Sequence, residues 1–519
     1  MQDPASDTAQ DPTPMVAAFL ADPASHGGAA VELVETHAAI VFLAGNRAYK
    51  LKRAVRYPYL DYSTVERRRA SCEEELRLNR RTAPSLYLGL DSVVRRPDGA
   101  LAFGGGAAAG GTALDWLVVM HRFPQDALLD RVAERGALGD DLVRGLADAV
   151  TAFHAAAEPR PDGGGAAAMR EVVEGNVAEL RARPSLFEPE RVERLAERSA
   201  DALERLAPLL EDRRRCGFVR HCHGDLHLRN IVLLEGRPVL FDGIEFDERL
   251  AVIDVAYDLA FLLMDLERRG LRPQGNAVLN RCLDATEDYG ALAPLPLFLS
   301  ARAAVRAKIA ATTAALRPGA DAARRAEREA VTYLERAVAA LEPPPPRLVA
   351  VGGLSGSGKT RLARALAPSL GASPGAVVLR SDALRKRLFG VGETERLPAD
   401  AYTPAVTERV YAGLLERART VLAAGHAVVL DAVHARPEER SAAARLAADA
   451  GVRFDGIWLD APLDARVARI AARRGDASDA TAEVAERQAV YDLGPIEWLR
   501  TNAGRDAGET LAAVLERLV

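Results

Sequence analysis

The stretch HGDLHLRN at residues 223–230, followed by VLFDGIEFD at residues 239–247, decides the fold that we expect for the first half of the chain. Asp225 stands five residues before Asn230, and Asp242 ends an apolar run directly before a glycine. Phosphoryl transfer needs one carboxylate to orient the acceptor hydroxyl, and an amide with a second carboxylate to hold Mg²⁺. The sequence therefore predicts Asp225 as a catalytic base, and Asn230 and Asp242 as Mg²⁺ ligands.

Histidines flank the predicted base and leave two other interpretations open. Imidazole and carboxylate groups bind metal ions, so His221, His223 and His227 with the neighbouring acids form a competing candidate metal site. The same stretch could also be a polar turn between a helix and a strand. The spacing of Asp225 and Asn230 and the later Asp-Gly pair account for more of these residues, and phosphoryl transfer is therefore the leading interpretation.

A lysine that steadies the phosphates of ATP is expected upstream of this stretch. Residues 38–45 (AAIVFLAG) and 47–55 (RAYKLKRAV), joined by a Gly-Asn turn, predict a β-hairpin. Lys50 is the predicted catalytic and phosphate-binding lysine. Because side chains alternate along a strand, Lys52 lies on the same face and remains the alternative.

A helix is expected over residues 63–83, and it would carry the glutamate that steadies the lysine. Glu73, Glu74 and Glu75 are all candidates, and we choose Glu75 for the nucleotide-binding set. The glycine-rich loop that covers the phosphates in protein kinases is missing, and a short turn replaces it. Gly224 also stands where protein kinases have an arginine. Both departures favour a small-molecule acceptor over a protein substrate.

These motifs give the first half of the chain a family resemblance. Residues from about 30 to 335 resemble the aminoglycoside phosphotransferase and choline-kinase-like superfamily, in which H-G-D-x-x-x-x-N replaces H-R-D. The resemblance implies a bilobal α+β kinase fold, ATP and Mg²⁺ as cofactors, and a small-molecule hydroxyl acceptor. It also implies that Asp258, in DVAYDLAFL, supports the catalytic loop. A fold analogy of this kind does not make aminoglycosides the substrates.

A second phosphate motif, GLSGSGKT, occupies residues 353–360 in the other half of the chain. A β-branched run precedes it and a helical run follows, which is the context of a Walker A loop. Backbone amides of such a loop surround the phosphates, Lys359 reaches the outer phosphates and acts in catalysis, and Thr360 offers its hydroxyl to Mg²⁺. The predicted nucleotide-binding residues of the loop are Gly353, Ser355, Gly356, Ser357, Gly358, Lys359 and Thr360.

Two predicted strand ends supply further candidates in this half. Carboxyl ends of parallel strands face the ligand crevice, and VVLRSD ends at Asp382. Asp382 could accept the proton of an acceptor hydroxyl, and Arg385 could bind an anionic group of the substrate. Ser381 or Asp382 could instead cap the following helix. Asp431, at the end of the next strand candidate, is a possible Mg²⁺ ligand or a turn residue.

A basic stretch lies near the end of the chain. Arg466, Arg469, Arg473 and Arg474 lie in and after a predicted helix, where a mobile lid could deliver an arginine to the phosphates. We choose Arg473 as the nucleotide-binding residue, and a solvated basic helix face is the alternative. Residues from about 347 to 519 resemble small P-loop kinases, such as the zeta-toxin-like and gluconate-kinase-like proteins. That resemblance implies ATP-dependent phosphorylation of a small hydroxyl compound.

The length of 519 residues predicts two domains, because a single core rarely exceeds about 250–300 residues. Four successive prolines at 343–346 favour an extended spacer. We expect an α+β bilobal kinase-like domain followed by an α/β P-loop domain with a parallel sheet. The predicted divisions are a disordered tail (1–14), the kinase-like domain (15–341), a proline-rich linker (342–347) and the P-loop kinase domain (348–519).

Composition and charge narrow the partners. The net charge of −5 lacks the basic excess of a nucleic-acid-binding protein. The most apolar window is interrupted by aspartates and is too short to span a bilayer, so we expect no membrane partner. The four cysteines have neither zinc-site nor redox-pair spacing, and the N-terminus has no signal-peptide pattern. These features favour a cytoplasmic protein.

The whole chain resembles bacterial fusions described as bifunctional aminoglycoside phosphotransferase/ATP-binding proteins. The leading hypothesis is a transferase with two kinase domains, each moving the γ-phosphate of ATP to a hydroxyl of a small molecule. Alternatively, one domain is a nucleotide-binding module that regulates a single catalytic domain. A third class, suggested by the second half alone, is a toxin-like kinase acting on a nucleotide-sugar. The sequence identifies neither acceptor.

Overall fold

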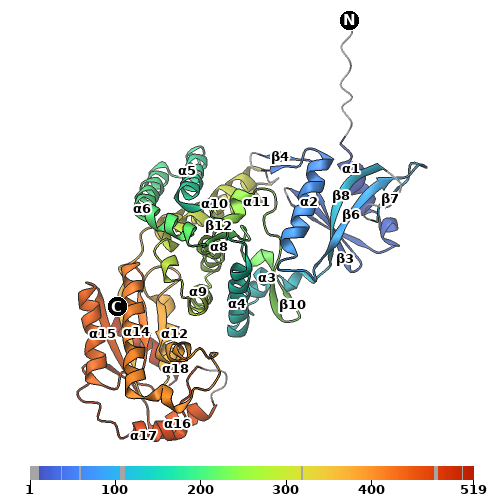
Figure 1. Cartoon of the computed structure of the whole chain (residues 1–519). Coiled ribbons are helices and arrows are strands. Elements are labelled where there is room, and N and C mark those ends of the chain that lie inside the picture. The colour runs from blue at the N-terminus through green and yellow to red at the C-terminus, as the bar shows by residue number, and fades with distance from the viewer. Residues whose placement is uncertain are drawn as a thin grey trace. The chain divides into compact units, whose positions relative to one another are not determined.

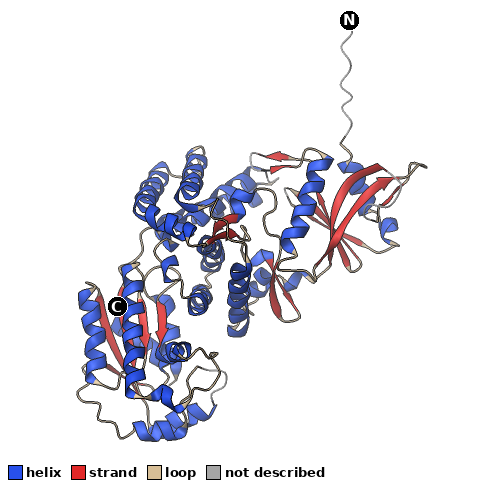
Figure 2. Cartoon of the chain, in the orientation of Figure 1, coloured by secondary structure: helices blue, strands red, loops and turns tan. Residues whose placement is uncertain are grey.

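The computed structural model describes residues 11–36, 38–57, 60–105, 112–316, 319–472, 477–504 and 506–518. The chain divides into two compact units, of which the first is residues 1–168 with 211–259, and the second is residues 169–210 with 260–519. Figure 1 labels their helices and strands, and Figure 2 separates the two kinds of element by colour.

The first unit begins with a six-stranded sheet. Its elements are α1 (Thr13–Ala21), β1 (Val31–Glu35), β2 (Ala39–Ala44), β3 (Arg47–Lys52), β4 (Arg56–Tyr57), β5 (Leu60–Asp61), α2 (Val65–Asn79), β6 (Tyr87–Arg95), β7 (Leu101–Phe103) and β8 (Thr112–His121). The strand order is β1-β2-β3-β8-β6-β7, with every pair antiparallel. The predicted hairpin is confirmed, because β2 and β3 pair from Ala44 with Arg47 onwards. Most of the Gly/Ala-rich stretch at 104–111, between β7 and β8, lies outside the described residues.

Helices cover both faces of this sheet, because its strands alternate apolar side chains. On one face Tyr49 and Leu51 of β3 pack in a cluster with Val16 and Leu20 of α1. On the other face Ala48 packs in a cluster with Cys72 of α2, and α2 lies along β8 and β6 (Figure 1). Lys50 and Lys52 alternate with Tyr49 and Leu51, so both lysines project toward α2.

The remainder of the first unit carries the HGDLHLRN stretch between short strands. The elements are α3 (Leu129–Glu134), α4 (Asp140–Ala156), β9 (Val219–His221), the 3₁₀ turn η3 (Leu228–Asn230), β10 (Ile231–Leu234), β11 (Arg237–Leu240), α7 (Glu248–Ala251), β12 (Val252–Asp254) and the start of α8 (Val255–Arg268). β10 and β11 form a hairpin whose turn residues, Glu235 and Gly236, are both left-handed, as a two-residue turn requires. Asp225 therefore precedes η3, and Asp242 follows β11.

The second unit combines a helical part with a parallel sheet. Its helices before the sheet are α5 (from Gly165 to Arg181), α6 (Pro189–Arg215, shared with the first unit), the end of α8, α9 (Arg272–Thr286), α10 (Leu295–Leu316) and α11 (Ala320–Ala340). α10 and α11 pack extensively against each other. Asn176 of α5 donates to the carbonyl of Ala301 in α10 at 3.2 Å, so α5 joins the same bundle.

The parallel sheet has five strands. Its elements are β13 (Arg347–Gly352), α12 (Lys359–Leu366), β14 (Val377–Arg380), α13 (Ser381–Leu388), the 3₁₀ turn η6 (Ala399–Tyr402), α14 (Pro404–Ala423), β15 (Val428–Asp431), α15 (Pro437–Asp449), β16 (Arg453–Asp460), α16 (Leu463–Ala472), α17 (Ala482–Gln488), β17 (Leu499–Asn502) and α18 (Ala507–Leu518). The strand order is β14-β15-β13-β16-β17, with every pair parallel. This arrangement confirms the predicted α+β kinase-like and α/β P-loop fold classes.

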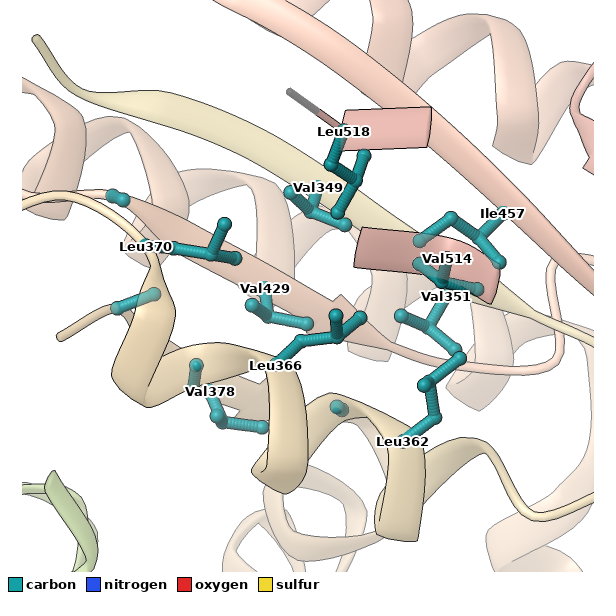
Figure 3. Packing of buried hydrophobic residues seen from close by; sticks show 14 of the residues in the cluster. Val349, Val351, Leu362, Leu366, Leu370, Val378, Val429, Ile457, Val514 and Leu518 are labelled. Carbon is teal, nitrogen blue, oxygen red and sulfur yellow. The ribbon is translucent and has the colours of Figure 1, made fainter. Parts of the chain in front are cut away.

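The core of this sheet lies under α12 and α18. Val351 and Ile457 of the sheet pack with Leu362 of α12 and Val514 of α18, as Figure 3 shows. Trp458 alternates with Ile457 and therefore faces the opposite side of the sheet, where the guanidinium of Arg440 from α15 stacks 5.8 Å from its ring centre. The sheet is covered on both faces, which is usual for a parallel sheet.

The predicted proline-rich linker lies between a helix and the first strand of the parallel sheet. α11 ends at Ala340 and β13 begins at Arg347, with the prolines between them. The compact units, however, divide the chain at other places, so the division at 342–347 stays a prediction. α1 begins at Thr13 and overlaps the predicted tail by two residues, while residues 1–10 lie outside the described part. Among the described residues, the helices lack the length and apolar composition needed to cross a bilayer.

Candidate active sites

In the first unit, Lys50 lies between two carboxylates. Its Nζ is 2.8 Å from Glu75 Oε1 on α2 and 2.6 Å from Asp242 Oδ1 after β11. Burial alone would lower the pKa of Lys50, but the charges of Asp242 and Glu75 raise it well above its usual value. Lys50 therefore stays an ammonium and joins α2 to the strand end that carries Asp242.

Lys52 lies on the same strand face but has different partners. Its Nζ is 2.7 Å from Glu75 Oε2 and 2.5 Å from Glu245 Oε1, and its side chain is almost completely buried. The two lysines share the buried carboxylate of Glu75 and, against the effect of burial, lower the pKa of Glu75 to about 2. Of the two lysines, Lys50 is the one that contacts Asp242.

The neighbouring glutamates of α2 point elsewhere. Glu73 accepts a hydrogen bond from Arg69 Nε at 2.9 Å, and Glu74 accepts one from Arg77 Nε at 2.8 Å. Both arginines are exposed to solvent. The register of α2 therefore turns Glu75 alone of these three glutamates toward the lysines.

Asp225 and Asn230 lie together after β9. Asn230 Nδ2 donates to Asp225 Oδ2 at 2.9 Å and to the Asp225 carbonyl at 3.0 Å. His227 Nε2 is 3.3 Å from the same carboxylate oxygen. The Phe241 amide donates to the Asn230 carbonyl at 3.0 Å, which brings Asn230 beside the residue that precedes Asp242. The structure thus brings Asp225, Asn230, Asp242, Lys50 and Glu75 into one region.

Buried hydrogen bonds hold the catalytic-loop backbone. The Asp258 carboxylate accepts from the amides of His223 and Gly224 at 3.2 and 2.9 Å, and from His154 Nε2 at 2.9 Å. His223 Nε2 donates to the Phe241 carbonyl at 2.9 Å, and its Nδ1 accepts from the Asp225 amide at 3.4 Å. Burial lowers the pKa of His223, so the neutral Nε2–H form fits both partners. Asp258 supports the loop in the way that the resemblance implied.

Two backbone positions in this region are left-handed. Gly224 has φ +82°, and a Cβ there would lie 2.9 Å from the Leu250 carbonyl oxygen. This conformation and this contact both require glycine. The glycine at position 224 therefore has a structural explanation, in addition to the small-molecule acceptor that the sequence suggested. Asp242 has φ 61°, and the Tyr87 hydroxyl accepts a hydrogen bond from its amide at 3.2 Å. A strained non-glycine residue at this point is typical of a functional site.

The competing metal site does not form as the sequence suggested. Among the described residues, the acid, histidine and cysteine side chains that converge closely enough for one ion are His154, Cys222 and Asp258. His221, His223 and His227 are not such a set. Because the Asp258 carboxylate already accepts from two loop amides and from His154, this group has a structural role in holding the loop.

In the second unit, the Walker A stretch joins β13 to α12 and adopts the expected glycine conformations. Gly353, Gly356 and Gly358 have φ values of +142°, +82° and +98°. A Cβ at Gly356 would lie 2.5 Å from the Arg466 carbonyl oxygen, so this glycine allows α16 to approach the loop. Lys359 Nζ donates to the Leu354 carbonyl at 3.2 Å across the loop.

Thr360 and Asp431, the two residues predicted as metal ligands in this half, are hydrogen-bonded to each other. Thr360 Oγ1 donates to Asp431 Oδ2 at 2.7 Å, and Asp431 is buried at the end of β15. Arg380, at the end of β14, places its Nε 3.6 Å from the same carboxylate oxygen. A hydroxyl and a carboxylate are both hard oxygen ligands, the kind that Mg²⁺ prefers.

The arginines of α16 contact the loop and do not form a solvated face. Arg466 is buried and donates to the Ser355 carbonyl at 3.4 Å, and Arg469 donates to the Ser357 carbonyl at 3.4 Å. Arg473 and Arg474 lie outside the described residues. Gln488 of α17 accepts a hydrogen bond from the Ser355 amide at 2.7 Å, a contact that no sequence motif indicated.

Asp382 and Arg385 lie on α13 near these residues. α13 begins at Ser381, and its N-cap residue is Arg380 without a side-chain cap, so Asp382 lies inside the first turn. Burial and the nearby Asp431 charge raise the pKa of Asp382, while Lys359 opposes the shift. Arg385 is buried, donates to the Ala401 carbonyl at 2.6 Å, and stacks 5.1 Å from the Tyr402 ring centre.

Two residues of this unit escaped the sequence analysis. His434 is buried after β15 with φ 50°, and its ring packs edge-on against Tyr411 and Trp498. Among the described residues, neither ring nitrogen has a hydrogen-bond partner. Asp479 lies 3.0 Å from Lys386 Nζ and accepts from the Tyr402 hydroxyl at 2.8 Å. The partners of both residues are distant from them in sequence, so no local pattern marks either residue.

Comparison with known proteins assigns the two candidate sites to two different protein families. Residues 45–295 match the profile of a phosphotransferase enzyme family, and residues 348–491 match that of an AAA domain. An uncharacterized protein of Mycobacterium tuberculosis (strain ATCC 25618 / H37Rv) is 33% identical over 477 residues, which cover 89% of this chain and 91% of the relative. An uncharacterized protein of Mycobacterium bovis has the same identity and coverage. The chain therefore carries two kinase-type domains.

Three solved structures illustrate the range of similar chains. An amicoumacin kinase in complex with AMP-PNP, Ca²⁺ and Ami is 13% identical and covers 62% of this chain and 93% of its own, with a TM-score of 0.38. The Mycobacterium tuberculosis APS kinase in complex with AMPPNP and APS is 26% identical and covers 34% and 98%, with a TM-score of 0.25. A gluconokinase from Sinorhizobium meliloti 1021 is 23% identical and covers 34% and 93%, with a TM-score of 0.24.

Proposed function

Because the chain belongs to one family with its uncharacterized mycobacterial relatives and its residues 45–295 form a phosphotransferase-family domain, we propose that each of its two kinase-type domains transfers the γ-phosphate of ATP to a hydroxyl group of a small molecule. The observation that carries the proposal for the first domain is the convergence of Lys50, Glu75 and Asp242 beside Asp225 and Asn230. The proposal also includes the domain division at the prolines and a cytoplasmic location.

In the first domain we assign Asp225 as the residue that orients the acceptor hydroxyl and takes its proton. Its carboxylate is partly exposed, so an acceptor can reach it. Asn230 Nδ2 and His227 Nε2 lie close to Oδ2 of this carboxylate and fix its orientation. Lys50, anchored by Glu75, binds phosphate oxygens of ATP and holds them in line with the hydroxyl.

The residues assigned to Mg²⁺ fit that ion by their chemistry. The amide nitrogen of Asn230 is engaged by Asp225, so the oxygen of the same amide is the atom left for a cation. Asp242 contributes a partly exposed carboxylate. When bound, Mg²⁺ would neutralise charge on the transferring phosphate. Asn230 and Asp242 are thus the proposed ligands in the first domain, and Thr360 and Asp431 in the second.

In the second domain we assign the Walker A loop to the phosphates and Asp382 to the acceptor. The loop glycines leave room for backbone amides to approach phosphate oxygens, and Lys359 follows directly at the start of α12. Asp382 is near enough to Asp431 and Lys359 for their charges to affect its pKa, which supports its assignment as the base of this domain. Arg385 is the proposed contact for an anionic group of the acceptor, and Arg473 remains a proposed nucleotide contact.

The experiment that tests the proposal uses the full chain and inactivates one site at a time. Asp225→Asn, Lys359→Ala and the double variant are incubated with ATP and a library of hydroxyl metabolites, and phosphorylated products are identified by mass spectrometry. We expect each single variant to lose a different product and the double variant to lose both. Asp201→Asn, an exposed aspartate of α6, is the matched control and should keep both products.

Two outcomes would change the proposal. If one single variant abolishes all transfer and the other only changes its rate, then one domain regulates the other, and the regulatory alternative replaces a two-kinase enzyme. If neither variant changes any product, the assigned residues do not carry the reaction.

A further inference from the structure

Helix α9 lies along the edge of the parallel sheet within the second unit. β14 is the edge strand, and its free side is occupied by α9 side chains. The Val378 amide donates to Asn280 Oδ1 at 2.7 Å, and Asn276 Nδ2 donates to the Ala376 carbonyl at 3.0 Å. Side-chain amides thus take the place of a neighbouring strand on this edge, which an open sheet would otherwise expose.

The contacts form a stripe with helical spacing. Arg272, Asn276, Asn280 and Asp284 are four residues apart and lie on one face of α9. Arg272 donates to the Pro368 carbonyl at 2.5 Å and to the Gly371 carbonyl at 3.2 Å. A polar stripe would ordinarily face solvent, but this one faces the sheet. α9 is therefore held to the P-loop fold from Arg272 to Arg281.

From the end of this helix a chain of ion pairs leads to the candidate metal pair. Arg281 of α9 lies 2.8 Å from Glu393 Oε2, and Arg380 lies 3.3 Å from Glu393 Oε1. Arg380 in turn lies 3.6 Å from Asp431 Oδ2, which accepts the hydrogen bond of Thr360 at 2.7 Å. Four contacts thus connect Arg281 of α9 with Thr360, one of the two proposed Mg²⁺ ligands of this domain.

Arg380 is the group that links the partly exposed end of this series of ion pairs to its buried end. Arg380 and Asp431 are both buried, whereas Glu393 and Arg281 are about one-third exposed. The geometry of a buried ion pair depends on the charged groups around it. When one of those groups is removed, the remaining groups form different pairs. Without Arg281, the Glu393 carboxylate would be left to Arg380 and would compete with Asp431 for the same guanidinium.

We infer that Arg281 is a positioning residue of the P-loop site, which acts through Glu393 and Arg380 to hold the Asp431 carboxylate where a Mg²⁺-nucleotide needs it. The inference rests on the proposed function of the second domain. It makes α9, which lies within the span matching the phosphotransferase profile, a working part of the nucleotide site on the parallel sheet.

The test measures AMP-PNP affinity of the full chain as a function of Mg²⁺ concentration. All proteins carry Lys50→Ala to weaken the first site, and Lys359→Ala in that background identifies the signal of the P-loop site. With Arg281→Gln, the Mg²⁺ concentration for half-maximal binding should rise about three- to tenfold. This is less than the roughly 10–100-fold loss that is usual for a direct partner of a metal ligand, because Arg281 acts through Glu393 and Arg380. Arg281→Lys keeps the charge and should restore most of the parent value. Gln274→Ala, elsewhere on α9, should leave it unchanged.

The outcomes separate this inference from the proposed function. Thermal unfolding of each variant is recorded, and Arg281→Gln should unfold within a few degrees of the parent because its side chain is partly exposed. If the folded variant binds AMP-PNP with the parent's Mg²⁺ dependence, the inference is wrong and the proposed function stands. If the parent binds no AMP-PNP at the P-loop, the proposed function of that domain and the inference both fail.

Discussion

The Lys50 ammonium and the Asp242 carboxylate are 192 residues apart in the chain and lie 2.6 Å apart in the fold. Lys50 also contacts Glu75, so a strand, a helix and a strand end meet at one ammonium group. Lys52, two residues away, joins the same glutamate to Glu245 in a buried position. The two lysines therefore have separable contributions, one toward the phosphates and one toward the stability of the lobe.

We predict that Lys50→Met and Lys52→Met have different consequences. Lys50→Met should reduce phosphate transfer by the first domain by at least about 100-fold, with a smaller change in unfolding, because Lys52 still pairs with Glu75. Lys52→Met leaves two buried carboxylates without this partner and should lower the free energy of unfolding by about 3–5 kcal/mol. Urea unfolding and product assays on both variants check the prediction, which is wrong if the two variants lose stability equally.

Asp225→Asn should lower the turnover of the first domain by about 10²–10⁴-fold, because the amide cannot take the proton of the acceptor hydroxyl. ATP affinity should change little, since Asp225 is not assigned to the nucleotide. The measurement is steady-state kinetics once an acceptor is found, with Asp201→Asn as the control. A variant that keeps parent turnover would remove Asp225 from its assigned role.

Gly224→Ala and Gly236→Ala form a matched pair for backbone and contact effects. Both glycines are left-handed, at φ +82° and +78°, but a Cβ at Gly236 meets open space and one at Gly224 meets the Leu250 carbonyl. Each variant should lose about 1–2 kcal/mol from its backbone conformation. Gly224→Ala should lose about 1–3 kcal/mol more from the contact. Equal unfolding free energies for the two variants would contradict this account.

The unfolding free energy should depend on pH through His434. Burial first, and then the charges of Lys359 and Arg440, lower the pKa of His434 to about 3. The unfolded chain takes up the proton near its ordinary pKa of about 6.5, and the folded chain does so only near 3. This contribution is therefore fully present above pH 6.5 and is lost as the pH falls from 6.5 toward 3, by about 1.4 kcal/mol for each unit.

His434→Phe tests this dependence directly. Because neither ring nitrogen is hydrogen-bonded within the part of the chain that the structure describes, phenylalanine can fill the site between Tyr411 and Trp498 without breaking a described hydrogen bond. The free energy of unfolding of the variant should fall less steeply between pH 6.5 and 4 than that of the parent. His121→Gln, on an exposed residue of β8, should keep the parent slope. Parallel curves for parent and His434→Phe would refute the prediction.

Much of both sites could be predicted because local patterns carry the information. Strand alternation placed Lys50 and Lys52 on one face, and the Walker A spacing placed Thr360 at a helix start. The choice between the lysines could not be made locally, since it depends on where Asp242 and Glu245 lie in three dimensions. β17 was missed because its sequence, LRTN, is short and polar for a strand. The roles of Arg466 and Arg469 depend on how closely α16 approaches the loop.

The asparagines of α9 bear on how this protein can be divided. Cutting the chain at the prolines would remove Asn276 and Asn280 from β14 and leave an unprotected strand beside Val378. Such an edge invites pairing between copies, and a P-loop segment produced alone would tend to aggregate. The unit that can be exchanged between proteins, or expressed as a fragment, must therefore begin before α9 and not at the four prolines.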